Sequence, residues 1–163
     1  MIALIVAYAH ENIIGNKGKI PWDIKGEKSR FRELTTGNVV VMGRKSFEEI
    51  GKPLPDRTIY VISSTKKFDM EGVHTVTSLK EAMYKAGDRD VFISGGERLY
   101  MEAIDIVEKM YITEIDLNVE GDTRFPEFDK SKFIKTIEKV VDGDIPYRYV
   151  TYTRKEFSCQ VND

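Results

Sequence analysis

The stretch NVVVMGRKSFEEI, residues 38–50, passes from a strand pattern to a helix pattern through a single glycine. Residues 38–42 form a mostly apolar, β-branched run, and a continuous run of this kind is typical of a strand covered on both faces. Residues 45–50 then predict a short helix. A buried strand that leads directly into a helix is the repeating unit of an α/β fold.

The same alternation extends to both sides of this stretch. We expect further strands at residues 2–7, 58–62, 91–93 and 109–113, and further helices at residues 26–36, 79–86 and 97–107. Such alternation predicts crossover units and a mainly parallel sheet. Residues 133–141 and 147–157 instead flank the turn Asp142-Gly143-Asp144, which indicates an antiparallel hairpin. The expected fold class is therefore α/β, with a mainly parallel central sheet of about eight strands, an antiparallel C-terminal hairpin and about four flanking helices.

Length and cysteine content set bounds on the organisation of the chain. A chain of 163 residues is about the size of one domain, so we expect a single domain over residues 1–157 and a frayed tail over residues 158–163. The single cysteine, Cys159, cannot form an internal disulfide. His10 and His74 are too far apart in the sequence to build a zinc site, and we expect no metal.

Charge and hydropathy argue against two classes of partner. The 25 Lys and Arg residues against 27 Asp and Glu residues give a net charge of -2, so no basic field would hold a nucleic acid. The longest apolar run, residues 2–9, is much shorter than the roughly 18 residues of a membrane span, and no charged segment precedes it as in a signal peptide. We expect a cytoplasmic protein with neither a nucleic acid nor a membrane as partner.

A carboxylate heads the apolar face of the first expected helix. Glu27, Phe31 and Leu34 share one face at i, i+4 and i+7. Glu27 is either a solvated first-turn carboxylate or a buried one that awaits a ligand with adjacent N–H donors, such as an amino-pyrimidine ring. Trp22, near the end of the long polar connection of residues 11–23, favours the second interpretation, because an indole N–H at a loop end commonly needs an acceptor or a bound water.

Glycines at two strand ends open helices. Gly43-Arg44-Lys45-Ser46 and Ser94-Gly95-Gly96-Glu97 leave backbone N–H groups free at a helix start, which favours an anion such as a pyrophosphate. Each segment alone is also compatible with a solvated turn, and neither has the spacing of a Walker A loop or of the usual dinucleotide fold. With Ser63-Ser64-Thr65 after a third strand, they would lie outside the carboxyl ends of parallel strands, where ligands bind. We therefore expect an extended ligand with several phosphates.

Two further side chains each allow two interpretations. Arg57 follows the rigid segment Pro53-Leu54-Pro55 and either binds a carboxylate through both nitrogens or forms a surface ion pair. Thr113, at the end of an expected strand, either hydrogen-bonds Glu27 or is an ordinary strand threonine.

In combination these motifs strongly resemble bacterial dihydrofolate reductase. The resemblance extends from residue 1 to about residue 157, with the motifs in register over a chain of the right length. The segments that carry it are Ile14-Gly15, Pro21-Trp22, Glu27, Phe31, residues 42–51, Pro53-Leu54-Pro55-Asp56-Arg57, Gly95-Gly96, Tyr100, Tyr111-Ile112-Thr113 and residues 120–126.

The resemblance implies NADPH-dependent reduction of 7,8-dihydrofolate to 5,6,7,8-tetrahydrofolate. It implies three catalytic residues: Glu27 for the 2-amino group and N3 of the pterin, Thr113 beside it, and Trp22 to hold a water. Because Glu27 would bind the opposite edge of the ring, a water admitted by residues 11–23 would protonate N5. The other substrate-binding residues that it implies are Ile5, Val6, Lys28, Phe31, Ile50, Leu54, Ser94, Tyr100 and, for the glutamate α-carboxylate, Arg57.

The resemblance also implies where NADPH lies. Ser46 and the two helix starts would hold the pyrophosphate, and Arg44, Ser63 and Ser64 the 2′-phosphate. It further implies a cis peptide between Gly95 and Gly96 and a monomeric protein. The implied cofactor-binding residues are Ala7, Ile14, Gly15, Gly18, Ile20, Gly43, Arg44, Lys45, Ser46, Ile62, Ser63, Ser64, Gly95, Gly96, Glu97, Arg98, Leu99 and Tyr100.

Three residues depart from the pattern of many chromosomal members of the family. Glu27 stands where those members have Asp, and Lys28 and Ser94 stand where they have apolar residues. In this the chain resembles antifolate-insensitive, often plasmid-borne members. We therefore expect antifolate inhibitors to address the same site and trimethoprim to bind it poorly.

Two other functions remain open on the sequence. A reductase of the same fold that acts on a pyrimidine in flavin biosynthesis would keep the cofactor elements but lose the set Trp22, Glu27, Phe31 and Arg57. A non-catalytic dinucleotide-binding module would bind the cofactor without turnover.

Overall fold

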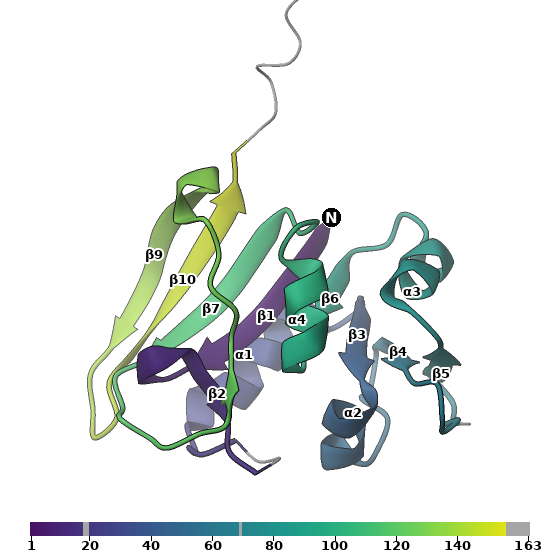
Figure 1. The fold of residues 1–163 in the computed structure, drawn as a ribbon, viewed down its shortest axis with the longest axis horizontal. Coiled ribbons are helices and arrows are strands. Elements are labelled where there is room, and N and C mark those ends of the chain that lie inside the picture. Colours follow the sequence, from purple (N-terminus) through teal and green to yellow (C-terminus); the bar gives the residue numbers. More distant parts are fainter. Residues whose placement is uncertain (18–19, 69, 156–163) are drawn as a thin grey trace, which may run out of the picture.

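A sheet of eight strands forms the centre of the molecule, as the computed structural model shows for residues 1–17, 20–68 and 70–155. Its strands are β1 (Ile2–Tyr8), β3 (Val39–Gly43), β4 (Thr58–Ile62), β5 (Val73–Val76), β6 (Val91–Ile93), β7 (Lys109–Ile115), β9 (Phe133–Val141) and β10 (Tyr147–Arg154). They lie in the order β5-β4-β3-β6-β1-β7-β10-β9 (Figure 1). The α-helices are α1 (Lys25–Thr35), α2 (Arg44–Ile50), α3 (Leu79–Ala86) and α4 (Glu97–Ala103).

Strand direction confirms the predicted α/β class. Every neighbouring pair from β5 to β7 is parallel, whereas β10 runs antiparallel to both β7 and β9. Within the eight-stranded sheet, the strand that the sequence did not locate is β5, whose burial changes from residue to residue along only four residues. So short and half-exposed a segment carries little hydrophobic signal.

Several predicted boundaries differ from those in the structure. The helix expected over residues 97–107 ends at Ala103, because the N–H groups of Ile106 and Val107 both bond to the Ala103 carbonyl, at 2.9 and 3.0 Å, and close a tighter turn. Val107 is nonetheless fully buried, which explains why its apolar character extended the helix pattern. Strand β10 ends at Arg154, and the end of the expected strand and the expected tail lie outside the described residues.

Helices cover both faces of the sheet. On one face, α3 and α4 pack over Val39 and Val41, and on the other, α1 and α2 pack over Val40 and Met42. Figure 1 shows α4 in front of the sheet and α1 behind it. Because successive side chains of a strand point to opposite faces, β3 needs apolar residues at every position.

A smaller sheet holds part of the long connection of residues 11–23. Its strands are β2 (Ile13–Gly15) and β8 (Thr123–Arg124), which run antiparallel (Figure 1). The backbone N–H of Asp122 donates to the Gly15 carbonyl at 3.1 Å, and the Asp122 carboxylate accepts from the N–H of Lys17 at 3.1 Å. The sequence predicted this connection as a loop without regular structure, whereas the structure docks it on residues 121–124.

None of the described helices is long and apolar enough to cross a membrane.

Candidate active site

A groove of about 1970 Å³ follows the carboxyl ends of the parallel strands. It collects almost every residue that the sequence singled out. Those expected to contact substrate are Ile5, Val6, Trp22, Glu27, Lys28, Phe31, Ile50, Leu54, Arg57, Ser94, Tyr100 and Thr113. Those expected to contact cofactor are Ala7, Ile14, Gly15, Ile20, Gly43, Arg44, Lys45, Ser46, Ile62, Ser63, Ser64, Gly95, Gly96, Glu97, Arg98 and Leu99, while Gly18 lies outside the described residues.

A carboxylate and a hydroxyl meet inside the groove. Glu27 lies in the first turn of α1, and the Oγ1 of Thr113 on β7 donates to its Oε1 at 2.7 Å. Burial raises the pKa of Glu27, against the opposing effects of the Thr113 hydrogen bond and of the charge on Arg30. Thr113 itself is 2% exposed, so this contact occurs in the interior of the molecule. Glu27 is therefore a partly desolvated acceptor that faces a ligand groove.

Tyr100 shapes the floor of the groove. Its hydroxyl donates to the Ile5 carbonyl at 2.8 Å, and burial raises its pKa, so the phenol stays neutral. A Cβ at Gly95 would lie 3.0 Å from the Tyr100 ring, and the φ angle of Gly95 is +103°. Glycine at position 95 is thus required both by the contact and by the backbone conformation.

Two helix starts lie side by side in the groove. Gly43 and Gly96 are the N-caps of α2 and α4, and no side chain caps either helix. The N–H of Gly43 donates to the Gly95 carbonyl at 2.8 Å, and the Gly95–Gly96 peptide is cis. A Cβ at Gly96 would lie 3.8 Å from the Ser46 hydroxyl. The arrangement places uncapped backbone N–H groups and a hydroxyl together, which suits a phosphate group.

Cations lie close to these helix starts. Arg44 donates to Glu48 at 2.9 Å, and Lys66 contacts the other carboxylate oxygen of Glu48 at 3.0 Å. Ser63, at the end of β4, accepts from the N–H of Lys66 at 3.0 Å. Exposed ion pairs of this kind are weak, so Glu48 does not hold Arg44 firmly.

Arg57 is held by neutral oxygens. Its Nε donates to the Pro55 carbonyl at 2.9 Å, and a terminal nitrogen donates to the Thr35 hydroxyl at 3.2 Å. Burial and the nearby charge of Arg32 lower the pKa of Arg57. The guanidinium is therefore fixed in place while its charge stays available to a carboxylate.

The groove also contains residues that the sequence did not single out. Arg30 was missed because a lone helix arginine usually lies in solvent, although its place three residues after Glu27 was a usable signal. Thr77 and Ser78 were missed together with β5, which positions them. Thr65, which the sequence placed at the same strand end as Ser63 and Ser64, also lines the groove. The other missed lining residues are Asp23, Ile24, Arg32, Thr36, Met42, Glu49, Lys52, Pro55, Asp56, Leu79, Glu102 and Thr123.

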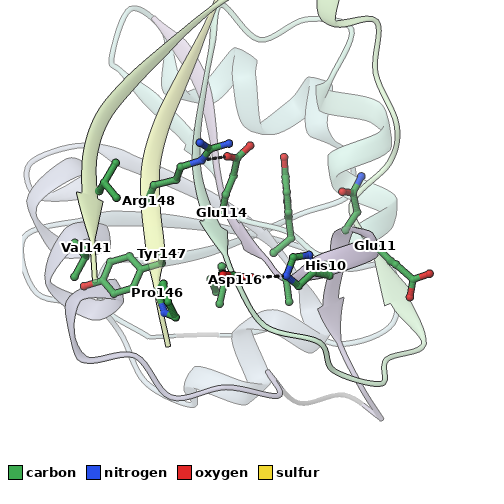
Figure 2. Close-up of a pocket in the computed structure, with 13 residues that line it drawn as sticks. His10, Glu11, Glu114, Asp116, Val141, Pro146, Tyr147 and Arg148 are labelled. Carbon is green, nitrogen blue, oxygen red and sulfur yellow. Dashed lines mark hydrogen bonds and ion pairs between the residues drawn. The ribbon is translucent and has the colours of Figure 1, made fainter. Parts of the chain in front are cut away.

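A second cleft of about 490 Å³ lies apart from this set (Figure 2). It contains a contact between the Nε2 of His10 and the Asp116 carboxylate at 2.7 Å and an ion pair between Arg148 and Glu114 at 2.6 Å. The charge of Arg148 is thus not left unopposed. Nor do three His, Cys, Asp or Glu side chains gather as a metal site would need, within residues 1–17, 20–68 and 70–155.

Known proteins are similar to this chain in sequence and in architecture. A family model described as dihydrofolate reductase matches residues 1–154. Dihydrofolate reductase of Bacillus subtilis is 34% identical over 163 residues, covering 97% of each chain, and that of Staphylococcus aureus strain Mu50 is 36% identical over 159 residues, covering 95% of this chain and 99% of the relative. A structure of the Enterococcus faecalis dihydrofolate reductase in complex with NADP(H) and RAB-propyl is similar with a TM-score of 0.84 and 34% identity, covering 96% of this chain and 97% of that one.

Proposed function

The chain belongs to the dihydrofolate reductase family and is an NADPH-dependent oxidoreductase that reduces dihydrofolate, and we propose that Glu27 and Thr113 bind the pterin in the groove described above. The observation that carries the proposal is the 2.7 Å hydrogen bond between these side chains inside that groove. A partly buried carboxylate needs donors, and the 2-amino group and N3 of a pterin supply two adjacent ones.

The residues of the groove fit NADPH. Uncapped N–H groups at the starts of α2 and α4, together with Ser46, suit a pyrophosphate, and glycines at the two N-cap positions, Gly43 and Gly96, leave the backbone there free of side chains. We assign the 2′-phosphate to Arg44, Ser63 and Ser64, which line the same part of the groove. When bound, the cofactor supplies a hydride for C6 of the pterin.

The remaining groove residues would hold the rest of the substrate. Phe31 and Leu54 are packed against the core below the groove, and Ile50 lies 36% exposed at its edge, so all three offer apolar surface to the rings. Arg57 is assigned to the glutamate α-carboxylate, because its fixed guanidinium can donate to both oxygens. We further assign protonation of N5 to a water admitted beside residues 11–23, with Trp22 as its holder, since Glu27 binds the opposite edge of the ring.

The Glu27→Gln variant tests this assignment. The amide loses the negative charge that orients the pterin, so hydride transfer at neutral pH should fall by orders of magnitude, while the Kd for NADPH stays nearly unchanged. Stopped-flow absorbance at 340 nm measures the first quantity, and cofactor fluorescence titration the second. Full activity in the variant would contradict the assignment, and NADPH binding without dihydrofolate-dependent oxidation in the parent protein would indicate a non-catalytic module.

We also propose that trimethoprim binds poorly. The longer carboxylate side chain of Glu27 and the polar side chains of Lys28 and Ser94 all line the groove, and together they alter the surface offered to a diaminopyrimidine and its trimethoxyphenyl ring. The expected inhibition constant is therefore micromolar or weaker. A submicromolar constant in a steady-state assay would contradict the proposal.

At the level of organisation, we propose a single domain, acting as a cytoplasmic monomer. One sheet contains both β1 and β10, from opposite ends of the described chain, which supports a single folding unit. Sedimentation equilibrium tests the monomer, because a mass near twice 18.7 kDa would exclude it.

A further inference from the structure

Arg30 occupies an unusual place for a helix arginine. It lies on α1 three residues after Glu27 and lines the same groove. Its guanidinium carbon is 4.0 Å from the centroid of the Tyr149 ring on β10. A cation over an aromatic face at this distance is attracted by the ring and held in one orientation.

The two strands that face α1 bring these contacts into register. Tyr149 on β10 is paired directly with Thr113 on β7 in the antiparallel ladder. Directly paired residues of such a ladder point to the same face of the sheet. Thr113 binds Glu27 and Tyr149 stacks on Arg30, so one cross-strand pair holds two side chains of α1 that are nearly one turn apart.

Gly26 permits this close packing. A Cβ at position 26 would lie 2.7 Å from the Tyr147 hydroxyl and 2.9 Å from the Tyr149 hydroxyl. Burial is the main cause that raises the pKa of Tyr149 to about 12, and a hydrogen bond with Tyr147 adds to it. The Tyr149 side chain beneath Arg30 is therefore neutral at physiological pH. The first turn of α1 is thus pressed against two tyrosines, which fixes the helix to the sheet beside Glu27.

Few groups act on the charges of Glu27 and Arg30. On the described residues, the groups that act on Glu27 are Thr113 by its hydrogen bond and Arg30 by its charge. Those that act on Arg30 are Glu27 from α1, Tyr149 from β10, Tyr111 from β7 and Glu138 from β9. Arg30 is therefore the cation that directly opposes the effect of burial on the Glu27 carboxylate.

We propose that Arg30, held on the Tyr149 ring three residues after Glu27 on α1, is a positioning residue whose charge favours the ionised form of the Glu27 carboxylate. The catalytic consequence rests on the proposed function of Glu27, whereas the charge coupling itself does not. A purely mechanical role, in which Arg30 only braces α1 against β10, is the alternative to be tested.

Direct titration of Glu27 distinguishes the two. Side-chain carboxyl carbons of ¹³C-labelled glutamate are followed by NMR against pH, with Glu27→Gln used to assign the signal. Arg30→Gln should raise the Glu27 midpoint, because it removes the positive charge that favours the ionised carboxylate, and Arg30→Lys should restore most of the parent value. Lys80→Gln on α3, an exposed position of equal charge outside the groove, should leave the midpoint unchanged.

The outcomes separate clearly. An unchanged Glu27 midpoint in folded Arg30→Gln, or equal shifts in the Gln and Lys variants, would overturn the proposal. If Arg30→Gln does not fold, Tyr149→Leu keeps the charge and removes its platform, and a smaller upward shift is expected, whereas no shift overturns the proposal.

The pH dependence of the steady-state kinetics provides an independent test of the proposal. As the pH falls, the KM for dihydrofolate should begin to rise at a higher pH in Arg30→Gln than in the parent or in Arg30→Lys, with kcat less affected. A purely mechanical role of Arg30 predicts that KM depends on pH in the same way in the parent, in Arg30→Gln and in Arg30→Lys. Because the titration needs no turnover, an inactive parent protein would contradict the proposed function and still leave the charge coupling measurable.

Discussion

Glu27 brings an ionisable group into a partly buried place. Because burial raises its pKa above the ordinary value, the folded chain holds the carboxyl proton more tightly than the unfolded chain does. The hydrogen bond from Thr113 and the charge of Arg30 reduce this effect without cancelling it. In the ligand-free protein, ionisation of Glu27 therefore opposes folding, and a ligand that donates to the carboxylate removes that penalty.

The stability of Glu27→Gln should depend on pH in a defined direction. Since the folded pKa lies above the unfolded one, the penalty is absent below the unfolded value and complete above the folded value. The variant should raise the Tm of the ligand-free protein at pH 8 by roughly a few degrees, and the gain should vanish towards about pH 4. Differential scanning calorimetry measures it. Glu33→Gln, at an exposed position of the same helix, is the matched control, and an equal gain there would contradict the argument.

At the residue scale, local spacing predicted the side chains and long-range packing decided their surroundings. Helical periodicity placed Glu27 on an inward face, but only the sheet register could place Thr113 and Tyr149 opposite it. Arg30 illustrates the limit, because nothing within α1 indicates that an aromatic ring from β10 will lie 4.0 Å away.

Among the elements, the pair β2 and β8 contributes residues to the wall of the groove. Gly121 packs so closely on this pair that a Cβ there would lie 2.6 Å from the Gly15 carbonyl oxygen and would also collide with the Ile13 side chain. Ile14 and Gly15 of β2 line the groove, as does Thr123 of β8. The contact at Gly121 thus controls where these groove residues lie.

Gly121→Val should displace β2 while the main sheet remains folded. Overpacking of this kind costs roughly 1–3 kcal/mol, which corresponds to a loss of about 5- to 150-fold in the equilibrium constant for docking residues 11–17. Hydride transfer measured by stopped flow should slow accordingly, with far-UV circular dichroism unchanged. Gly87→Ala, where φ is +62° and no atom lies within 4 Å of the new Cβ, is a control with backbone strain alone, and equal slowing there would argue against the docking explanation.

The sequence predicted those strands that are themselves continuous apolar runs, and it did not predict strands that are too short to form such a run. The runs at β1, β3, β4 and β6 are buried along most of their length, so the sequence alone revealed them. β2 and β8, of three and two residues, exist because distant segments pair, and a single segment contains no trace of that pairing.

Across the whole molecule, the sheet divides the hydrophobic core into two clusters, each of which packs different helices against the strands. The larger one joins α3 and α4 to the central strands, and the smaller one joins α2 to β3 and β4 through Phe47. Phe47 is 1% exposed, and its ring packs edge-on against the Phe68 ring, with 4.9 Å between the two ring centroids. The smaller cluster therefore supports the helix whose start is assigned to the cofactor.

Phe47→Ala should weaken both the fold and cofactor binding. Removing a fully buried aromatic ring lowers the free energy of unfolding by about 3–5 kcal/mol, and the loosened α2 should raise the Kd for NADPH. Urea denaturation and fluorescence titration measure the two effects. Tyr84→Ala, at a position 87% exposed, should change the free energy of unfolding by no more than about 0.5 kcal/mol, and a similar small change in Phe47→Ala would exclude the proposed support.

The position of β1 in the strand order affects how the chain is made. β1 leaves the ribosome well before β6 and β7, which begin at Val91 and Lys109 and between which it lies in the sheet. Throughout synthesis of the first half of the protein, β1 therefore has two open edges and an apolar surface with nothing to pair against. Completion of the sheet must await late segments, and that interval is when a nascent chain of this topology is most exposed to aggregation and most dependent on chaperones.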